Sequence, residues 1–111
     1  MGWREREIVT DSLSTILYKN IFKRARLDEI TLKDEPGVYL IACPADNGPY
    51  TNIDAYESDN MKSDLENNQN KNKWYDKCPG SRTLEILYKY MPGSSDQDRT
   101  SLLQEIKACQ M

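Results

Sequence analysis

The sequence contains no histidine among its 111 residues. Histidine is the most frequent general base in enzymes, and it completes the Ser-His-Asp and Cys-His nucleophile pairs, so those catalytic arrangements are excluded. Glycine is also scarce. The five glycines are scattered through predicted turns and form no glycine-rich loop of the kind that cradles phosphates. Any catalysis by this chain must therefore use other side chains.

Cysteine is sparse, and long apolar runs are absent. The three cysteines, Cys43, Cys78 and Cys109, include no CxxC pair, so without histidine one chain lacks the four ligands of a zinc site. We interpret them as free thiols in a reducing cytoplasm rather than as a disulfide framework. No apolar run approaches the roughly 20 residues of a membrane span. We therefore expect a cytoplasmic protein with no signal peptide and no membrane contact.

The net charge of −3 is unevenly distributed. Residues 1–33 carry seven Lys and Arg against five Asp and Glu, whereas residues 34–111 carry eight against thirteen. An acidic body binds phosphate backbones poorly, because that affinity comes from basic side chains. The basic N-terminal part remains a candidate surface for nucleic acid or for a protein partner, and its members are Lys19, Lys23, Arg24 and Arg26. The alternative is a solvated face whose cations favour a helix C-terminus.

The hydrophobic spacing predicts three strands. Short buried strands are expected at residues 38–42 and 50–56, separated by a turn and able to pair as a hairpin. The clearest strand is expected at residues 83–91, where alternate positions are apolar or aromatic. These positions are predicted to pack in the core, and they are Leu84, Ile86, Tyr88 and Tyr90.

Helical spacing appears before, between and after these strands. The first helix has one apolar face, made of Val9, Leu13, Ile16, Leu17 and Ile21. A weaker helix is expected around Met61 and Leu65. The last helix is expected to be capped by Ser94 or Ser95, with Ser94 and Gln97 at capping-box spacing. Its apolar stripe comprises Leu102, Leu103, Ile106 and Cys109.

Together these elements predict an α+β fold in one domain spanning residues 1–111. A small three-stranded mixed or antiparallel sheet is flanked by helices, with an extra N-terminal helix. The basic helical segment occupies residues 1–33, and the α/β core occupies residues 35–109. Residues 66–73 carry almost no apolar side chain and are predicted to form a mobile polar loop.

One motif resembles a known family. The segment Pro36-Gly37-Val38-Tyr39-Leu40-Ile41, followed after ten residues by Tyr50-Thr51-Asn52, is similar to the opening of a GIY-YIG nuclease domain. That family continues through a helix, a third strand and a further helix, in the order predicted for residues 35–109. The resemblance implies that Tyr39 and Tyr50 position and activate the attacking water. It also implies an arginine on the next helix, and a glutamate on a later helix that holds a divalent metal such as Mg²⁺.

The departures from that family concern the catalytic groups. Tyr50-Thr51-Asn52 lacks the glycine, and the arginine position falls at Asn60. A rival register places Asp64 at the arginine position and Asp54 in place of the second tyrosine. Lys62 is the nearest cation in either register, and lysine lacks the bidentate grip of arginine on phosphate. Glu105 is the nearest candidate for the metal-binding glutamate. The resemblance therefore implies the fold more than the activity, and we expect no cofactor unless the domain is catalytic, in which case Mg²⁺ is implied.

Three functions remain open from the sequence. The first is a GIY-YIG-like domain with an eroded site that binds nucleic acid or protein. The second is a divergent metal-dependent nuclease that uses Tyr39, Tyr50, Lys62 and Glu105. The third is an unrelated interaction module, for which an exposed apolar patch is the expected feature, with Trp3, Trp74 or Tyr75 as candidates and Trp74 favoured as core packing. The carboxylates of the polar region from the hairpin turn to the weak helix are expected to be solvated or to hold a hard cation such as Mg²⁺, and they are Asp46, Asp54, Glu57, Asp59 and Asp64.

Overall fold

A four-stranded antiparallel sheet forms the centre of the protein in the computed structural model, which describes residues 12–43, 51–78 and 84–108. The strands are β1 (Lys23–Arg26), β2 (Gly37–Cys43), β3 (Thr51–Ser58) and β4 (Glu85–Tyr90), in the spatial order β1-β4-β2-β3. All three pairings are antiparallel, and β2 and β3 form the predicted hairpin, with a register shift between Ile41 and Ala42. The α+β class is confirmed, but the prediction of three strands is wrong, because residues 23–26 add a fourth.

The additional strand β1 explains why the basic segment is not one helix. Helix α2 (Ser12–Lys19) ends before Lys23, and the chain then reverses at Ile21. After the reversal, Phe22 packs on one core cluster, while Ala25 and Leu27 pack on the other. This alternation is that of a strand, with three of the four β1 residues exposed. The helical expectation for residues up to 33 therefore fails beyond α2.

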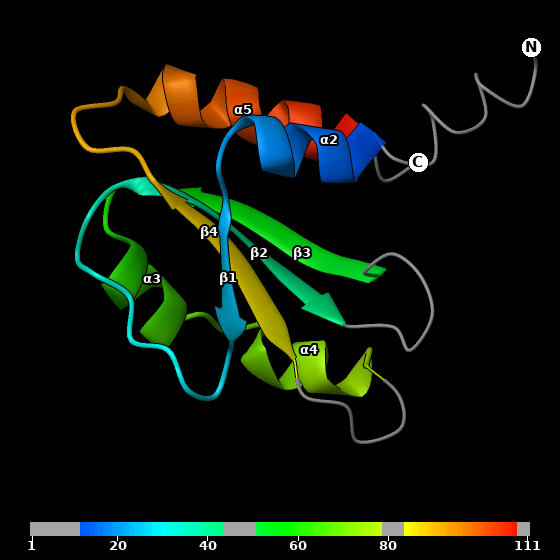
Figure 1. The fold of residues 1–111 in the computed structure, drawn as a ribbon. Helices are drawn as coiled ribbons and strands as arrows, with labels where there is room; N and C mark the ends of the chain where they lie inside the picture. The colour runs from blue at the N-terminus through cyan, green and yellow to red at the C-terminus, as the bar shows by residue number, and fades with distance from the viewer. Residues whose placement is uncertain (1–11, 44–50, 79–83, 109–111) are drawn as a thin grey trace, which may run out of the picture.

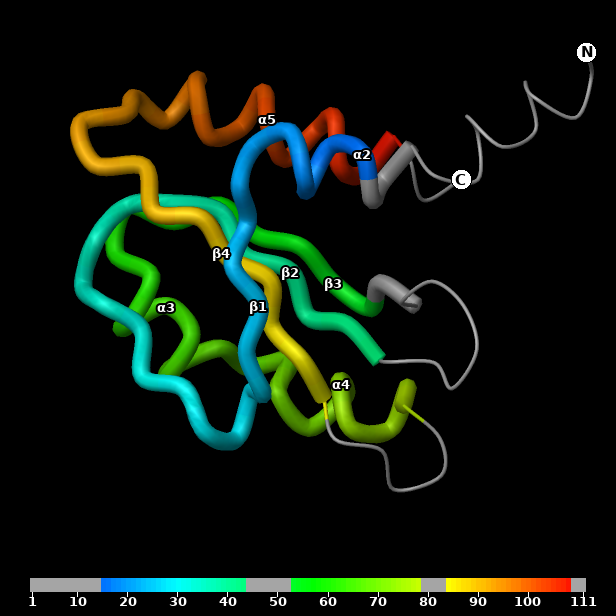
Figure 2. Tube along the Cα trace, in the orientation of Figure 1, coloured from blue at the N-terminus to red at the C-terminus, as the bar shows by residue number. Residues whose placement is uncertain are grey.

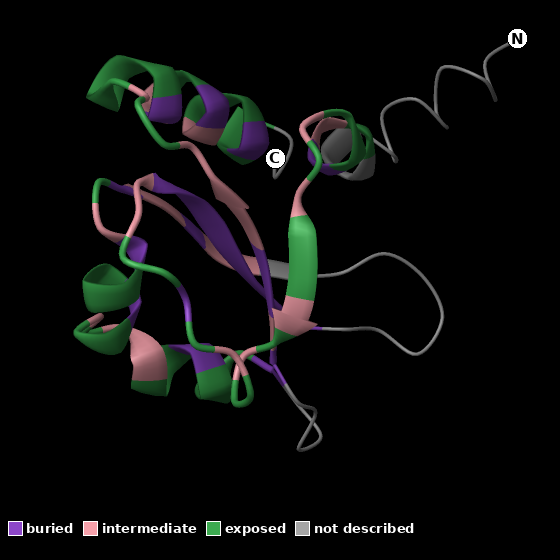
Figure 3. Ribbon diagram, turned by 60° about the vertical axis from the view of Figure 1, so that its left-hand side comes forward, coloured by how far each residue is buried: buried purple, intermediate pink, exposed green. Residues whose placement is uncertain are grey.

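Helices cover both faces of the sheet (Figure 1). Helices α2 and α5 (Asp96–Ala108) lie over one face, and α3 (Met61–Glu66) and α4 (Lys71–Asp76) lie over the other. Strand β2 runs between the two layers and is buried along its whole length, so its apolar run is continuous rather than alternating. Figure 2 shows the chain crossing between these layers, and Figure 3 shows the buried inner surfaces and exposed outer surfaces of the helices.

Two hydrophobic clusters fill these layers. The cluster under α3 and α4 includes Tyr39, Ile41, Met61, Trp74 and Ile86. The cluster under α2 and α5 includes Val38, Leu40, Leu87, Leu102 and Ile106. Successive residues of β2 alternate between them, as the period of a strand requires. The predicted alternation of Leu84, Ile86, Tyr88 and Tyr90 is confirmed, since all four belong to the first cluster or pack against it.

The predicted polar loop at residues 66–73 is only partly a loop. Glu66 is the last residue of α3, and Lys71 to Lys73 form the first half of α4. Helix α4 has one completely buried residue, Trp74, whose large ring holds the helix against the sheet while its other side chains remain polar. Because one aromatic anchor replaces an apolar stripe, hydrophobic periodicity does not predict this helix. The weak helix around Met61 and Leu65 is confirmed as α3, with both residues buried.

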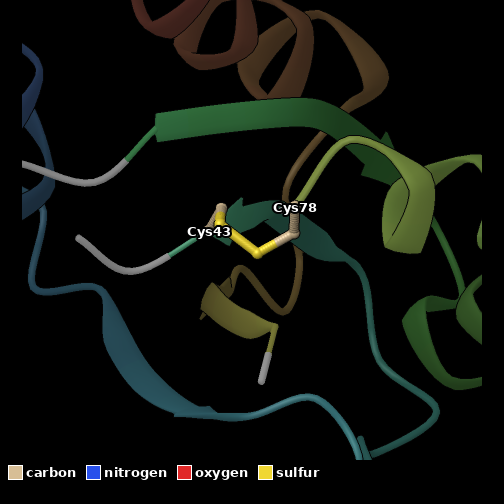
Figure 4. Close-up of a disulfide and its surroundings, with 2 residues drawn as sticks. All are labelled: Cys43 and Cys78. Carbon is tan, nitrogen blue, oxygen red and sulfur yellow. A yellow bond between two sulfur atoms is a disulfide. The ribbon is translucent and has the colours of Figure 1, made fainter. Parts of the chain in front are cut away.

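Two of the cysteines are bonded to each other, which corrects their interpretation as free thiols. A disulfide joins Cys43 at the end of β2 to Cys78 just after α4, with their Cα atoms 5.5 Å apart (Figure 4). Both residues are buried. Spacing in the sequence did not predict this pair, because the fold brings together cysteines that are 35 residues apart. Cys109 lies outside the described residues.

Helix α5 begins with a capping box, and a buried arginine holds the helix to the sheet. The Ser95 hydroxyl accepts a hydrogen bond from the Asp98 amide at 3.1 Å, and the Asp98 carboxylate accepts one from the Ser95 amide at 3.3 Å. The capping box is therefore Ser95 with Asp98, not the predicted Ser94 with Gln97. Arg99 is 2% exposed and pairs with Glu57 of β3 at 3.0 Å. The predicted stripe is confirmed for Leu102 and Ile106, which are buried.

Gly37, the glycine of the Pro-Gly-Val-Tyr segment, has a structural role. A Cβ atom at this position would overlap the Lys89 carbonyl of β4 and the Met61 sulfur of α3.

We expect Gly37→Ala to lower the free energy of unfolding by about 3 kcal/mol, because a central strand has no room to shift. Gly93→Ala is the matched control, since Gly93 has a φ of 76° and no atom within 4 Å of its ideal Cβ. That control is expected to cost only about 1 kcal/mol, from backbone conformation alone. Equal losses in urea denaturation would contradict this role.

Candidate functional site

The tyrosine of the motif, Tyr39, is completely buried in β2. Its hydroxyl donates a hydrogen bond to the Asp64 carboxylate of α3 at 2.8 Å and accepts one from the Asn68 amide at 3.2 Å. Burial raises the pKa of Tyr39 well above the usual value of a phenol, and the hydrogen bond to Asp64 raises it further. The hydroxyl is therefore held as a proton donor inside the fold, a poor state for activating water.

A second, partly buried network lies beside the first. The Tyr56 hydroxyl donates to the Asp54 carboxylate at 3.0 Å, and the Trp74 indole donates to the same oxygen at 2.8 Å. The Asn70 amide donates to the Tyr56 hydroxyl at 3.2 Å, and the Tyr39 and Tyr56 rings are 5.3 Å apart. Burial raises the pKa of Tyr56 as well, and its hydrogen bond from Asn70 partly offsets that rise. These contacts fix α4 and the α3–α4 connection to the sheet.

The structure does not assemble the predicted catalytic set. Lys62 is exposed on α3, and α3 packs on the same core cluster as Tyr39. Glu105 is exposed on α5, which covers the opposite face. Tyr50 lies outside the described residues. In the described ranges, no group of three or more carboxylate, imidazole or thiol side chains is placed to hold a metal ion. The sheet therefore separates Tyr39 from the predicted metal-binding glutamate.

An open pocket of about 590 Å³ lies where β3 meets α3 and the α3–α4 connection. Apart from Tyr56, its lining residues all carry polar side chains, and Asp64 and Asn68 in its wall are the residues that hold the Tyr39 hydroxyl. The rival register with the GIY-YIG motif places the family's arginine at this same Asp64. In that register a carboxylate takes the place of the phosphate-binding cation that the resemblance implies, and in the first register the position falls at Asn60, which also lines the pocket. The reversal of charge opposes binding of a phosphodiester in this pocket.

The predicted binding cations occupy two kinds of environment. Arg24 pairs with Glu85 at 2.8 Å, and Arg26 lies within 3.5 Å of Asp28 and Glu29. Lys19 at the end of α2 and Lys23 at the start of β1 are exposed and make no ion pair with any residue that the structure describes. The four predicted residues are thus not one uniform basic patch, because both arginines are already paired with carboxylates.

Two large apolar side chains stand beside those lysines. Tyr18 is 89% exposed and Ile21 is 79% exposed, the two most exposed large hydrophobic residues in the described structure. We call residues 18–23 the α2–β1 segment. Neither residue was predicted to be exposed, and Ile21 was placed on the apolar face of the first helix. The error arose because the helix ends at Lys19, and Ile21 then lies beyond its apolar face.

The backbone at Ile21 is unusual. Ile21 has a φ of 60°, the only positive φ of a residue other than glycine in the described part of the chain. The Phe22 amide bonds to the Leu17 carbonyl at 3.0 Å, and the Ile21 amide bonds to the Tyr18 carbonyl at 3.1 Å. These are the two hydrogen bonds of a Schellman motif, in which the left-handed position is normally glycine. A β-branched residue there costs about 1–2 kcal/mol.

The tryptophan and tyrosine candidates for a contact surface differ in their outcomes. Trp74 is completely buried, which confirms its prediction as core packing. Tyr75, the next residue, is 54% exposed. Trp3 lies outside the described residues.

None of the described helices is long and apolar enough to cross a membrane. No family model, curated protein or solved structure was found to match the chain.

Proposed function

We propose that this domain is a non-catalytic binding module that contacts an acidic protein partner through its α2–β1 segment. The observation that carries the proposal is Ile21, which is 79% exposed while its backbone occupies a conformation suited to glycine. A strained apolar residue on the surface costs stability and contributes little packing in return. Backbone strain of this kind is found mainly at functional sites, where the side chain takes part in binding or catalysis.

The neighbouring side chains indicate the chemistry of the partner. Tyr18 supplies a second exposed ring, and aromatic residues are enriched among the side chains that dominate interface energies. Lys19 lies between Tyr18 and Ile21 in the chain, Lys23 follows them, and neither lysine has a carboxylate partner in the described structure. An extended segment with an apolar residue next to Asp or Glu would match both features.

Nucleic acid is the weaker alternative for this surface. Arg24 and Arg26, which were predicted to take part in phosphate binding, are paired with carboxylates. Releasing them would expose the acids that they neutralise. A surface with two unpaired lysines and two large apolar side chains favours protein over a phosphate backbone, whose affinity depends on many cations.

The resemblance to the GIY-YIG family contributes a fold to this proposal, but no nuclease activity. The order of hairpin, helix, strand and helix agrees with that family, which supports a common architecture. The buried Tyr39, the acid at the arginine position and the separation of Glu105 support an eroded site, and they give the divergent-nuclease alternative less support. A cytoplasmic location also remains a prediction. The Cys43–Cys78 disulfide argues for an oxidising compartment instead, since cytosolic thiols are kept reduced.

The substitution Ile21→Gly separates binding from folding. Glycine suits the left-handed position, so we expect the variant to gain about 1 kcal/mol of unfolding free energy by urea denaturation. Loss of the side chain is expected to weaken binding by at least about tenfold. The binding probe is a peptide selected on the wild-type domain from a random display library, and its affinity is measured by calorimetry.

The selected peptides also test the partner chemistry. We expect them to carry an apolar residue beside Asp or Glu, and to lose affinity for Tyr18→Ser and for the double variant Lys19→Glu, Lys23→Glu. Tyr75→Ser is the matched control, because Tyr75 is an exposed tyrosine on α4 and should leave affinity unchanged. Unchanged binding by Ile21→Gly would overturn the proposal. So would duplex DNA binding with a steep salt dependence that the Lys19→Glu, Lys23→Glu variant abolishes.

A further inference from the structure

We propose that the open pocket between β3 and the α3–α4 connection binds a guanidinium or ammonium group. The pocket measures about 590 Å³, enough for a side chain or a small molecule. Its lining residues come from the end of β3, from α3 and from the segments on either side of α3, and none belongs to the α2–β1 segment. This inference is therefore independent of the partner proposed above.

The lining is rich in hydrogen-bond acceptors and contains no lysine or arginine. Five of the residues carry a carboxamide, namely Asn60, Asn67, Asn68, Gln69 and Asn70. Two carboxylates, Asp59 and Asp64, supply negative charge. Glu57 also belongs to the lining, but Arg99 holds its carboxylate. The combination of negative charge with many neutral acceptors suits a cation that carries several N–H donors.

Hydrogen bonds to the Tyr39 and Tyr56 hydroxyls hold part of the pocket wall in place. Asp64 and Asn68 are fixed by the buried Tyr39 hydroxyl, at 2.8 and 3.2 Å. The Asn70 amide is held by the Tyr56 hydroxyl at 3.2 Å, and its backbone amide is held by the Asn68 side chain at 2.9 Å. Groups that are already ordered lose little entropy when a ligand binds.

An unsatisfied acceptor also points to a donor ligand. The Asn60 side-chain oxygen is buried and has no hydrogen-bond partner in the described structure, although Asn60 lines the pocket. A buried acceptor without a donor is costly, and a turn of the Asn60 side chain toward the pocket would let it accept a hydrogen bond from a guanidinium or ammonium N–H. A sugar hydroxyl would also donate, but it would gain nothing from the two carboxylates.

A metal ion is a poorer fit than an organic cation. Three carboxylates contribute to the lining, one of them already paired with Arg99, and no group of three metal-ligating side chains is placed to hold an ion in the described ranges. Mg²⁺ and Ca²⁺ need several oxygens gathered around one point, whereas the acceptors here are spread around a wide pocket and match the several N–H groups of a guanidinium.

The test is a calorimetric titration of the wild-type protein with agmatine and with the blocked peptide acetyl-Gly-Arg-Gly-amide. We expect saturable binding of both, and Asp59→Asn and Asp64→Asn are each expected to weaken it about tenfold. In the Asp64→Asn variant the carboxamide oxygen would still accept the Tyr39 hydrogen bond, so the substitution removes charge and retains the wall. Asp76→Asn is the control, because Asp76 is exposed on α4 outside the lining and should leave affinity unchanged.

The two probes also distinguish the source of the cation. Tighter binding of the peptide indicates a side chain of a polypeptide, and equal binding indicates that a free amine suffices. No binding of either probe would overturn the proposal. It would also be overturned by binding that both asparagine substitutions leave unchanged, by equal affinity for a neutral sugar such as glucose, or by Ca²⁺ at the same concentration displacing the probes.

Discussion

Replacing Trp74 by alanine is expected to lower the free energy of unfolding by about 3–5 kcal/mol. Trp74 is the single buried residue of α4, and it is completely inaccessible to solvent. Its indole also donates to Asp54 at 2.8 Å, so truncation removes a donor as well as the packed ring. A domain of this size has about 5–15 kcal/mol of stability, so the variant should be close to unfolding at 37 °C. The measurement is urea denaturation followed by circular dichroism.

Two companion variants separate the causes. Tyr75→Ala removes an aromatic ring from the next position of the same helix, and because Tyr75 is 54% exposed we expect a loss below about 1 kcal/mol. Trp74→Phe retains most of the apolar contact but removes the indole donor, and it should cost about 1–3 kcal/mol. If Trp74→Ala unfolded at the same urea concentration as Tyr75→Ala, α4 would not depend on this anchor.

Removing the Cys43–Cys78 disulfide is expected to cost about 3–4 kcal/mol, from the entropy that the cross-link removes from the unfolded chain. The two cysteines are 35 residues apart, and a loop of this length is costly to close without the bond. The test compares the double variant Cys43→Ser, Cys78→Ser with the wild-type protein, each with and without a reducing agent. Reduction should destabilise the wild-type protein and leave the double variant unchanged.

Two outcomes would contradict that expectation. Mass spectrometry of an unreduced digest should detect one species in which the peptides of Cys43 and Cys78 are joined. Absence of this species would show that the bond does not form. A wild-type protein whose denaturation midpoint is insensitive to reduction would show that the bond adds no stability. Because both sulfur-bearing residues are buried, the serine substitutions also bury two hydroxyls, so the reduced wild-type protein is the cleaner comparison.

The sequence predicted those elements in which apolar residues repeat. Strands β2, β3 and β4 and helices α3 and α5 each present such a pattern, and each is present. Strand β1 and helix α4 were missed because their pattern is weak. In β1, Ala25 is the one partly buried residue among three exposed basic residues, and α4 depends on the single ring of Trp74. Pairing across the sheet and one deep anchor stabilise these two elements, and neither is visible in local periodicity.

The candidate site was less predictable than the fold. The sequence singled out Tyr39 as a candidate catalytic residue, but its burial and its contact with Asp64 could not be read from the motif, because both depend on how α3 packs. The exposure of Ile21 depended on the residue at which α2 ends, and helix ends are set by local hydrogen bonding that spacing does not reveal. The predicted basic surface grouped two lysines with two arginines by residue type, but only the fold shows that the two arginines pair with carboxylates.

The disulfide has a topological consequence for the polar pocket. Every residue that lines this pocket, from Tyr56 to Asn70, lies between Cys43 and Cys78 in the chain. The pocket is therefore carried on a covalently closed ring. A peptide bond cut inside the ring would convert it to a nicked but still linked molecule, whose two pieces separate only after reduction. Covalent continuity around the pocket thus survives a single proteolytic event that would divide an unbridged chain.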